Sequence, residues 1–206
     1  LPIYVHIINE GIIDVESKVK TINEQNIKLI EVPSEIGAGT RGASLGVEAI
    51  KIAALDYMSN FFVHFPSEKI PTENKLLFEP IESPYAKRIK GVLSMYEKIT
   101  KAVSDSMKDN FFPVIISGDH SNAGATIAGI KMAKPKSKLG VIWIDAHADL
   151  HTPYTTPSGN LHGMPLANSY NSRASSIVSL NLLKTMYSSV ISLPVFSKKY
   201  NKAALS

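Results

Sequence analysis

The 206 residues suffice for one sizeable α/β domain, and a content of 44% hydrophobic and 19% charged residues is typical of a globular protein. No cysteine is present, which excludes disulfide bonds, thiolate metal ligands and a cysteine nucleophile. The net charge of +4 comes from residues 150–206, which hold five basic residues and no acid, whereas residues 1–149 hold 17 basic and 18 acidic residues. Because this charge is not spread over one face of a domain, we expect no nucleic-acid partner.

The apolar stretches near the two ends predict neither a signal peptide nor a membrane span. Residues 1–14 lack a basic leading region and contain Glu10 and Asp14. Residues 177–196 contain Asn181, Lys184 and several serines, which makes them too polar for a membrane helix. We therefore expect no membrane partner, and the absence of cysteine is compatible with a cytoplasmic location. The first residue is Leu rather than Met, so the natural start is expected upstream.

The first half of the chain predicts one strand and two helices. Residues 27–32 (IKLIEV) predict a short buried strand, and a helix is expected over 43–58. The intervening glycine-rich segment, 37–42, lacks the full spacing of a nucleotide-binding fingerprint, so a tight strand-to-helix turn is expected there. Residues 59–84 predict a loop or insertion. Apolar residues recur at three- and four-residue steps over 85–107, which predicts a long amphipathic helix.

Two further strands and a helix follow. Residues 114–117 predict a strand, and residues 121–134 predict a helix that stops before Pro135. The fully apolar run 139–144 (LGVIWI) suits a central parallel strand covered on both faces. The alternation of strands and helices predicts a single α/β domain over 1–206 with a mainly parallel, doubly wound sheet.

Polar residues close the apolar run 139–144. On an extended chain the alternate residues Asp145, His147 and Asp149 project to the same side, at the carboxyl end of a strand where α/β proteins place their ligand sites. A lone Asp-x-His pair is ordinarily salt-bridged or solvated. Three such groups closing a buried strand are costly to leave unpaired, which favours metal ligands.

His120 follows the neighbouring predicted strand, in the segment SGDHS, and is expected at the same rim. Two carboxylates and two imidazoles without sulfur suit Mn²⁺, and Zn²⁺ less well, with Fe²⁺ and Co²⁺ as alternatives. A pair of such ions can lower the pKa of a shared water.

The segment TPYTTPSGNLHG, residues 152–163, predicts a polar, turn-rich loop directly after this rim. Taken alone it is compatible with an ordinary surface loop. Beside a metal rim, its hydroxyl groups, Asn160 and His162 become candidates for substrate contacts. The imidazole of His162 could then pass a proton to a leaving amine.

These segments together resemble the ureohydrolase family. The runs SGDHS, DAHAD and TPYTTPSGNLHG carry the resemblance, and the last is more similar to arginases than to agmatinases. The upstream run EVPSEIGAGTRGASLGVEAIK is also similar to the family, and the resemblance covers roughly residues 27–167. It implies a three-layer α/β/α fold, a binuclear manganese site and trimeric or hexameric assembly.

The resemblance also implies the roles of individual residues. Asp145 would bridge the two ions, His120 and Asp149 would bind one, and His147 would bind the other. Asp149 and His162 are the candidate catalytic residues, with His162 as the proton shuttle. The candidate substrate-binding residues are His151, Ser158 and Asn160.

The chain departs from the family pattern at two places. His151 stands where arginases usually have an asparagine. The family also supplies two further aspartate ligands and a glutamate from later segments, whereas no acid follows Asp149. The tail 168–206 does not resemble the family's continuation, so a truncated, frameshifted or incomplete chain is expected.

The function expected from the resemblance is hydrolysis of L-arginine to L-ornithine and urea by a hydroxide that bridges two Mn²⁺ ions. Because His151 alters the arginine-type loop, formimidoylglutamase or another ureohydrolase is the alternative within the family. From a different class, the chain could be a truncated, non-catalytic relic.

Overall fold

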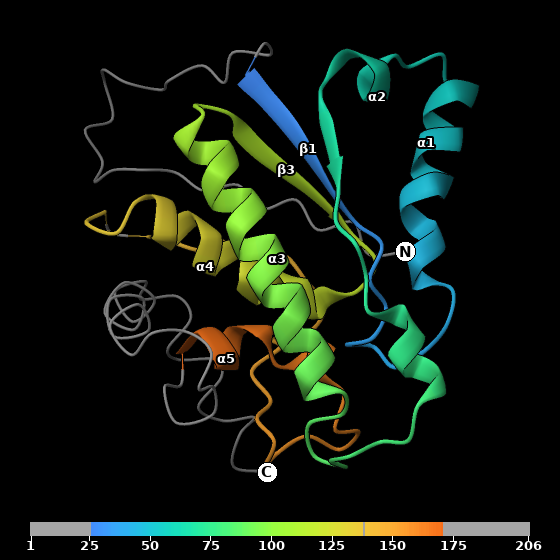
Figure 1. Ribbon diagram of the computed structural model, residues 1–206, viewed down its shortest axis with the longest axis vertical. Coiled ribbons are helices and arrows are strands. Elements are labelled where there is room, and N and C mark those ends of the chain that lie inside the picture. The colour runs from blue at the N-terminus through green and yellow to red at the C-terminus, as the bar shows by residue number, and fades with distance from the viewer. Residues whose placement is uncertain (1–25, 138, 171–206) are drawn as a thin grey trace.

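The computed structural model describes residues 26–137 and 139–170, which form helices on both faces of a small parallel sheet. Strand β1 (Ile27–Val32) is central, flanked by β2 (Ser67–Lys69) and β3 (Phe112–Ser117), and both neighbours run parallel to it. Leu29 of β1 lies opposite Ser67 on one side and Val114 on the other. Figure 1 shows β1 and β3 side by side. The carboxyl ends of these strands therefore lie at one edge of the sheet.

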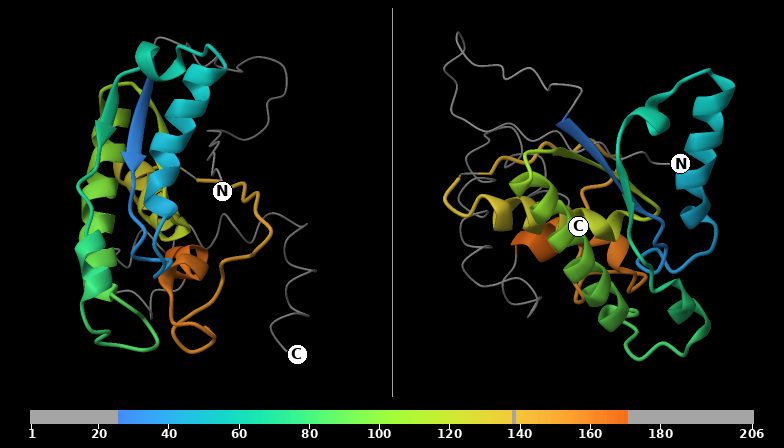
Figure 2. Two further views of the ribbon diagram at one scale, coloured as in Figure 1. Left: turned by 90° about the vertical axis from the view of Figure 1, so that its right-hand side faces the viewer. Right: turned by 45° about the horizontal axis from the view of Figure 1, so that its top comes forward.

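Two helices cover one face of the sheet and a third lies on the other. Helices α3 (Ile89–Lys108) and α4 (Ala123–Ala133) pack against each other, whereas α1 (Gly46–Asp56) lies on the opposite side of β1 (Figure 2). This arrangement confirms the expected α/β fold with a parallel sheet between helical layers. Among the described residues no helix is long and apolar enough to span a membrane.

The core lies between the sheet and the pair α3 and α4. The apolar stripe of α3 and the almost entirely buried α4 meet alternate residues of β1 and β3, as the amphipathic pattern of α3 predicts. The strands contribute Ile30, Val32 and Ile115 to the core, and α3 contributes residues that include Met95, Ile99 and Val103. This core fixes the strand ends relative to the start of α4, which is where the candidate site lies.

Most element predictions are confirmed, with shifted bounds. The strand 27–32 matches β1, and the helix 43–58 corresponds to a 3₁₀ turn at Ala43–Leu45 followed by α1. The long helix begins at Ile89 rather than near residue 85, because Arg88 has a φ of 55°, outside the helical region. The helix expected over 121–134 consists of the 3₁₀ helix η4 (His120–Asn122) and α4.

The segment 59–84, expected as a loop, contains regular structure. It includes the short helix α2 (Phe61–His64), the edge strand β2 and the 3₁₀ helix η3 (Asn74–Phe78). β2 has the sequence SEK, three polar residues without apolar alternation, so no pattern in the sequence indicates it. It forms because it pairs with β1 along the edge of the sheet.

The prediction of a strand over 139–144 is wrong, because these residues have no regular secondary structure. Val141 and Trp143 pack on the core, whereas Ile142 and Ile144 are 61% and 83% exposed. The side chains thus alternate between the core and the solvent as in a strand, but the described residues cover only one side of the segment. A buried central strand requires cover on both faces and hydrogen-bonded neighbours, and the prediction assumed both.

The tail 171–206 lies outside the described residues, as do residues 1–25 and 138. The distinct tail expected over 168–206 therefore stays a prediction. The short helix α5 (Pro165–Tyr170) is the last element that the structure describes.

Candidate metal centre and its neighbouring loop

A histidine and two aspartates converge beyond the carboxyl edge of the sheet. The Nδ1 atom of His120 lies 2.5 Å from Oδ2 of Asp149 and 3.2 Å from Oδ2 of Asp145. One ligand atom from each of the three residues lies within 4.8 Å of the others. The side chains are buried, with exposed fractions of 5% for His120 and 8% for each aspartate. We refer to His120, Asp145 and Asp149 as the acidic triad.

Local structure holds each member of the triad in place. His120 begins η4 directly after β3, and its ring stacks on Trp143 with centroids 4.4 Å apart. Asp149 has a φ of 49°, and its carbonyl oxygen accepts a hydrogen bond of 3.2 Å from the backbone N–H of Leu166 in α5. The chain bends at Asp145, whose Oδ1 accepts from the backbone N–H of His147 at 2.7 Å. The triad is therefore assembled by bends rather than by the alternation of an extended strand.

The structure does not bring His147 into the triad. Its side chain is 83% exposed, and its Nδ1 lies 3.4 Å from Oδ1 of Asp145, whereas His120 faces Oδ2 of the same carboxylate. Three of the four predicted ligands thus converge, and the roles of all four as ligands stay predictions. The prediction that Asp145, His147 and Asp149 project to the same side assumed an extended backbone. The chain bends at Asp145, so that assumption does not hold.

The donor chemistry of the triad fits a divalent cation. Two carboxylate side chains lie together out of solvent beside the ring of His120, and buried carboxylates are costly without compensation. Oxygen and imidazole ligands without sulfur are those that Mn²⁺ and similar ions accept. A bound cation would replace the direct contacts of His120 with the two carboxylates. The triad has too few anionic ligands for two ions, so further ligands are required for a binuclear site.

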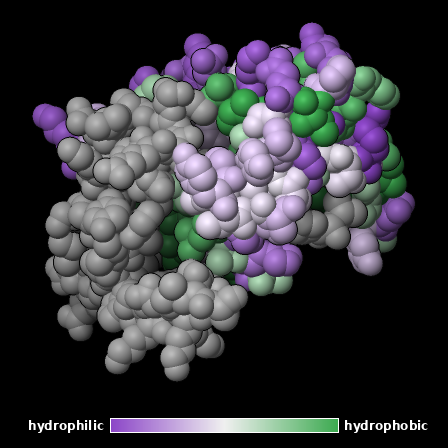
Figure 3. All heavy atoms as spheres, turned by 90° about the horizontal axis from the view of Figure 1, so that it is seen from below, coloured by the Kyte–Doolittle hydropathy of each residue, from purple (hydrophilic) through white to green (hydrophobic). Residues whose placement is uncertain are grey.

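The loop 152–163 leaves the triad and returns to it. The backbone N–H of His151 donates to the carbonyl oxygen of Gly163 at 3.1 Å, which closes the two ends of the loop. Within it, the N–H groups of Thr155 and Thr156 both donate to the carbonyl of Thr152 at 3.0 Å. Seen from below, this end of the molecule shows residues of near-neutral hydropathy between hydrophilic and hydrophobic ones (Figure 3). The two ends of the loop therefore lie together, next to Asp149.

The four loop residues with predicted roles occupy different positions. Ser158 and His151 are exposed, and Oγ of Ser158 accepts from the backbone N–H of Asn160 at 3.2 Å. The Oδ1 atom of Asn160 lies 2.8 Å from the position that a Cβ of Gly39 would occupy. The backbone N–H of His162 donates to the carbonyl oxygen of Gly37 at 3.1 Å. The loop thus packs against the glycine-rich segment 37–42 through Asn160 and His162.

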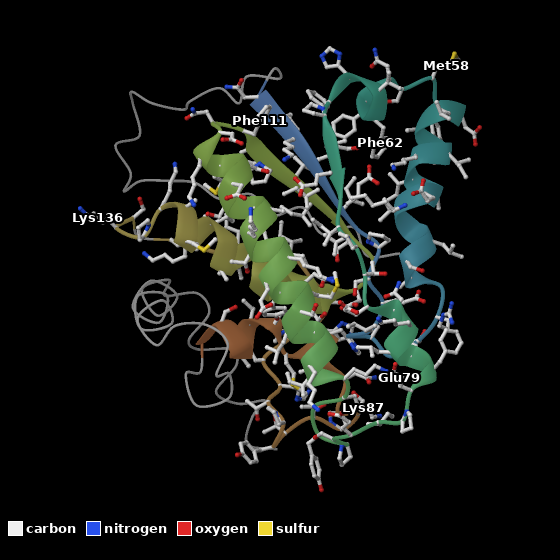
Figure 4. The ribbon with its side chains drawn as sticks, in the orientation of Figure 1. Met58, Phe62, Glu79, Lys87, Phe111 and Lys136 are labelled. Atoms are coloured by element: carbon white, nitrogen blue, oxygen red, sulfur yellow. The ribbon has the colours of Figure 1, made fainter. Side chains whose placement is uncertain are left out.

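A glycine in the loop is required by its surroundings. Gly159 has a φ of 71°, and a Cβ added to it would lie 1.8 Å from the carbonyl oxygen of Pro84. Its own carbonyl accepts a hydrogen bond of 2.9 Å from the backbone N–H of Lys87, which Figure 4 shows at the lower end of the molecule. The segment that precedes α3 therefore supports the loop from outside.

We expect Gly159→Ala to destabilise the protein by about 2–4 kcal/mol. A left-handed conformation alone costs a non-glycine residue roughly 1–2 kcal/mol, and the contact with Pro84 forces a further shift of backbone. Urea denaturation followed by circular dichroism measures this loss. Gly163→Ala is the matched control, because a Cβ at Gly163 meets its nearest neighbour, Cδ2 of His151, at an ordinary 3.7 Å. Equal stabilities of the two variants would contradict the described packing of the loop.

Two buried carboxylates near the site were missed by the sequence analysis. Asp119 caps η4 and accepts hydrogen bonds from Ser121 and Gly37. These bonds lower the pKa of its carboxyl, but burial raises it by more, so the pKa is raised overall. An aspartate between a strand and a helix is a recognisable N-cap signal. Glu35 accepts from the backbone N–H groups of Gly42 and Ser44, at 2.8 and 2.9 Å, and from Nε of Arg41 at 2.9 Å. No sequence pattern indicates this role of Glu35.

The hydrogen bonds of Glu35 predict a pH-dependent contribution to stability. Burial alone would raise the pKa of Glu35, but the bonds from Ser44, Gly42 and Arg41 together lower it below the ordinary 4.5. Its stabilising contribution is therefore fully present above pH 4.5 and is lost as the pH falls through the lowered pKa. We expect Glu35→Gln to cost on the order of 2 kcal/mol at pH 7, as charge-assisted bonds are lost, and progressively less in acid.

Thermal denaturation between pH 3 and pH 7 checks this expectation. Glu79→Gln is the control, because Glu79 is an exposed glutamate at the end of η3 (Figure 4). A Glu35→Gln penalty that stays constant over the whole range would rule out this role for the ionised carboxylate.

The fold and the triad together define a class of protein, a doubly wound α/β domain with a carboxylate–imidazole centre at its sheet edge. The Arginase family model matches residues 25–193, a range that reaches into the tail. The arginase of Brevibacillus brevis is 41% identical over 157 residues, covering 70% of this chain and 48% of that protein. The arginase of Bacillus subtilis (strain 168) is 37% identical over 166 residues, covering 76% and 52%.

Solved structures agree with these sequence comparisons. The structure of Entamoeba histolytica arginase in complex with L-ornithine superposes with a TM-score of 0.64 at 30% identity, covering 75% of this chain and 54% of that one. Arginase from Bacillus caldovelox gives a TM-score of 0.60 at 34% identity, with coverages of 74% and 52%. The chain belongs to the arginase family, and it spans about half the length of the curated relatives it matches.

Proposed function

We propose that this chain carries half of the active site of a metal-dependent hydrolase that converts L-arginine to L-ornithine and urea. The observation that carries the proposal is the acidic triad beside the closed loop 152–163. Family membership supports the reaction class, and arginases are the relatives that match. A relative was solved with the product L-ornithine bound, which supports an amino acid with a side-chain guanidinium as the substrate.

In this proposal His120, Asp145 and Asp149 would hold the metal, and His147 would be a ligand of a second ion. Mn²⁺ is the proposed metal, with two ions in the complete site. Divalent ions bound there lower the pKa of a coordinated water, which provides the strong nucleophile that a guanidinium carbon requires. Asp149 is also a proposed catalytic residue, because a carboxylate that binds a metal through one oxygen could accept a proton on the other.

The loop supplies the remaining roles. Ser158, Asn160 and His151 bind the α-carboxylate and α-amino groups, because polar side chains of a loop closed beside the metal can reach the far end of the substrate. When both of its ring nitrogens carry a proton, His162 would give the Nε2 proton to the leaving amine and keep the one on Nδ1. Its Nδ1 lies 3.2 Å from the carbonyl oxygen of Gly37, so the other nitrogen is left for the reaction.

The alternative activity within the family is that of a formimidoylglutamase, because His151 replaces the usual asparagine. The alternative from another class is a relic that binds metal without turnover, because no acid follows Asp149. We propose a homo-oligomer, a trimer or hexamer, as the assembly of the complete protein. Sedimentation velocity measures that assembly directly.

Parallel assays of three substrates test the proposed function. The Mn²⁺-loaded chain is incubated with arginine, agmatine and formiminoglutamate, and urea or formamide is measured. We expect urea from arginine in excess over agmatine, because agmatine lacks the carboxylate that the loop binds. Formamide from formiminoglutamate would replace the arginase assignment by the alternative, and absence of all products with saturable metal binding would support the relic.

A further inference from the structure

Asp119 is a buried carboxylate to which neither the metal centre nor the substrate loop assigns a role. Its Oδ1 accepts from the backbone N–H and the hydroxyl of Ser121, at 2.9 and 2.5 Å. Its Oδ2 accepts from the backbone N–H of Gly37 at 3.1 Å. The side chain thus joins the start of η4 to the glycine-rich segment 37–42, which is 82 residues away in sequence.

The peptide groups around Gly37 link Asp119 to His162. The N–H of Gly37 faces Asp119, and its carbonyl oxygen accepts from the backbone N–H of His162 at 3.1 Å. The same oxygen lies 3.2 Å from the ring atom Nδ1 of His162. A carbonyl oxygen has two lone pairs, so it accommodates both bonds. Backbone and ring of His162 are therefore held by one residue, and Asp119 holds that residue.

This contact favours one tautomer of His162. A carbonyl oxygen can only accept, so the hydrogen of a neutral imidazole must lie on Nδ1. Nε2 then carries the lone pair. Without this contact, the ring is free to place its hydrogen on either nitrogen and to turn.

The space around Gly37 shows how closely the three residues fit. A Cβ at Gly37 would lie 2.2 Å from Oγ of Ser121 and 2.5 Å from Oδ1 of Asp119. No side chain other than hydrogen fits there without displacing Asp119 or Ser121. The glycine thus allows the carboxylate of Asp119 to approach the backbone segment to which His162 is hydrogen-bonded.

We propose that Asp119 is a positioning residue that acts through the backbone of Gly37 to hold His162 as its Nδ1–H tautomer, which leaves Nε2 for proton transfer. The catalytic meaning of this arrangement rests on the proposed function. The arrangement itself does not, because ring orientation and tautomer are properties of the chain with or without turnover.

Nitrogen-15 NMR of the histidine side chains tests the proposal on the full chain without added manganese, at a pH where the ring is neutral. The two ring nitrogens of a neutral imidazole have distinct chemical shifts that report which one is protonated. The chain has six histidines, so the signal of His162 is identified by its loss in His162→Asn. We expect His162 in the unmodified protein to be predominantly the Nδ1–H tautomer. A predominant Nε2–H tautomer would overturn the proposal without any variant of Asp119.

Substitutions of Asp119 and Ser121 separate positioning from general structural support. Asp119→Ala is expected to make the Nδ1–H tautomer of His162 the minor form, and Asp119→Asn, whose amide oxygen still accepts one bond, is expected to retain more of it. Ser121→Ala is the matched control, because it removes the hydroxyl bond to Asp119 and leaves the bond from Gly37. An unchanged tautomer in both Asp119 variants, or an equal loss in Ser121→Ala, would overturn the proposal. Urea release tests the proposed function separately, since its failure leaves the tautomer measurement intact.

Discussion

Replacing Asp145 with asparagine is expected to weaken Mn²⁺ binding by at least about 100-fold. Residues that only support metal ligands typically contribute about 10–100-fold to affinity, and Asp145 is proposed to contact the metal itself. The substitution replaces a buried carboxyl group of the triad with a neutral amide of the same shape. Isothermal titration with Mn²⁺ measures the affinity of the variant and of the unmodified chain.

Asp56→Asn is the control for this substitution. Asp56 is an exposed carboxylate at the end of α1, so its loss changes the net charge equally without touching the triad. Circular dichroism establishes that both variants keep the helices of the parent. If Asp145→Asn bound Mn²⁺ within about twofold of the unmodified chain, Asp145 would not be a metal ligand.

The second large effect concerns turnover by the 206-residue chain as it stands. We expect it to release urea from arginine at least about 100-fold more slowly than Bacillus subtilis arginase under the same conditions. Two carboxylates are too few to hold two divalent ions with a charge of +4, and no Asp or Glu follows Asp149 to add anionic oxygen. The deficit corresponds to at least about 2.7 kcal/mol in the transition-state free energy.

Steady-state urea release with matched Mn²⁺ loading measures this difference. The relative serves as the positive control, and His162→Asn in this chain serves as the blank. Turnover within about tenfold of the relative, a difference of only ~1.4 kcal/mol, would mean that residues of this chain supply the ligands that we consider missing.

The elements of the fold that depend on local pattern were predictable from the sequence. The apolar run of β1 and the three- and four-residue spacing of α3 each indicate the element that forms. β2 was not predictable, because three polar residues become a strand only through pairing with β1. The run 139–144 has the composition of a buried strand, but its exposed face shows that composition alone does not supply neighbours.

In the candidate site, too, some features follow from local sequence and others depend on the fold. Polar residues after two predicted strands led to the expectation that His120, Asp145 and Asp149 would meet. They do meet, although only the segment before His120 is a strand and the chain bends at Asp145. The position of His147 was not predictable, since it depends on the bend at Asp145. The role of Asp119 depends on a hydrogen bond to Gly37 across 82 residues, which no local pattern encodes.

Crystals of the chain grown with Mn²⁺ and measured at the manganese absorption edge provide the most direct test of the central claim. The claim predicts an anomalous difference peak between the side chains of His120, Asp145 and Asp149, within bonding distance of all three. It also predicts that the direct contacts of His120 with the two aspartates are replaced by contacts to the ion. Anomalous peaks only at other positions, with those direct contacts intact, would contradict the claim that these three residues form a metal centre.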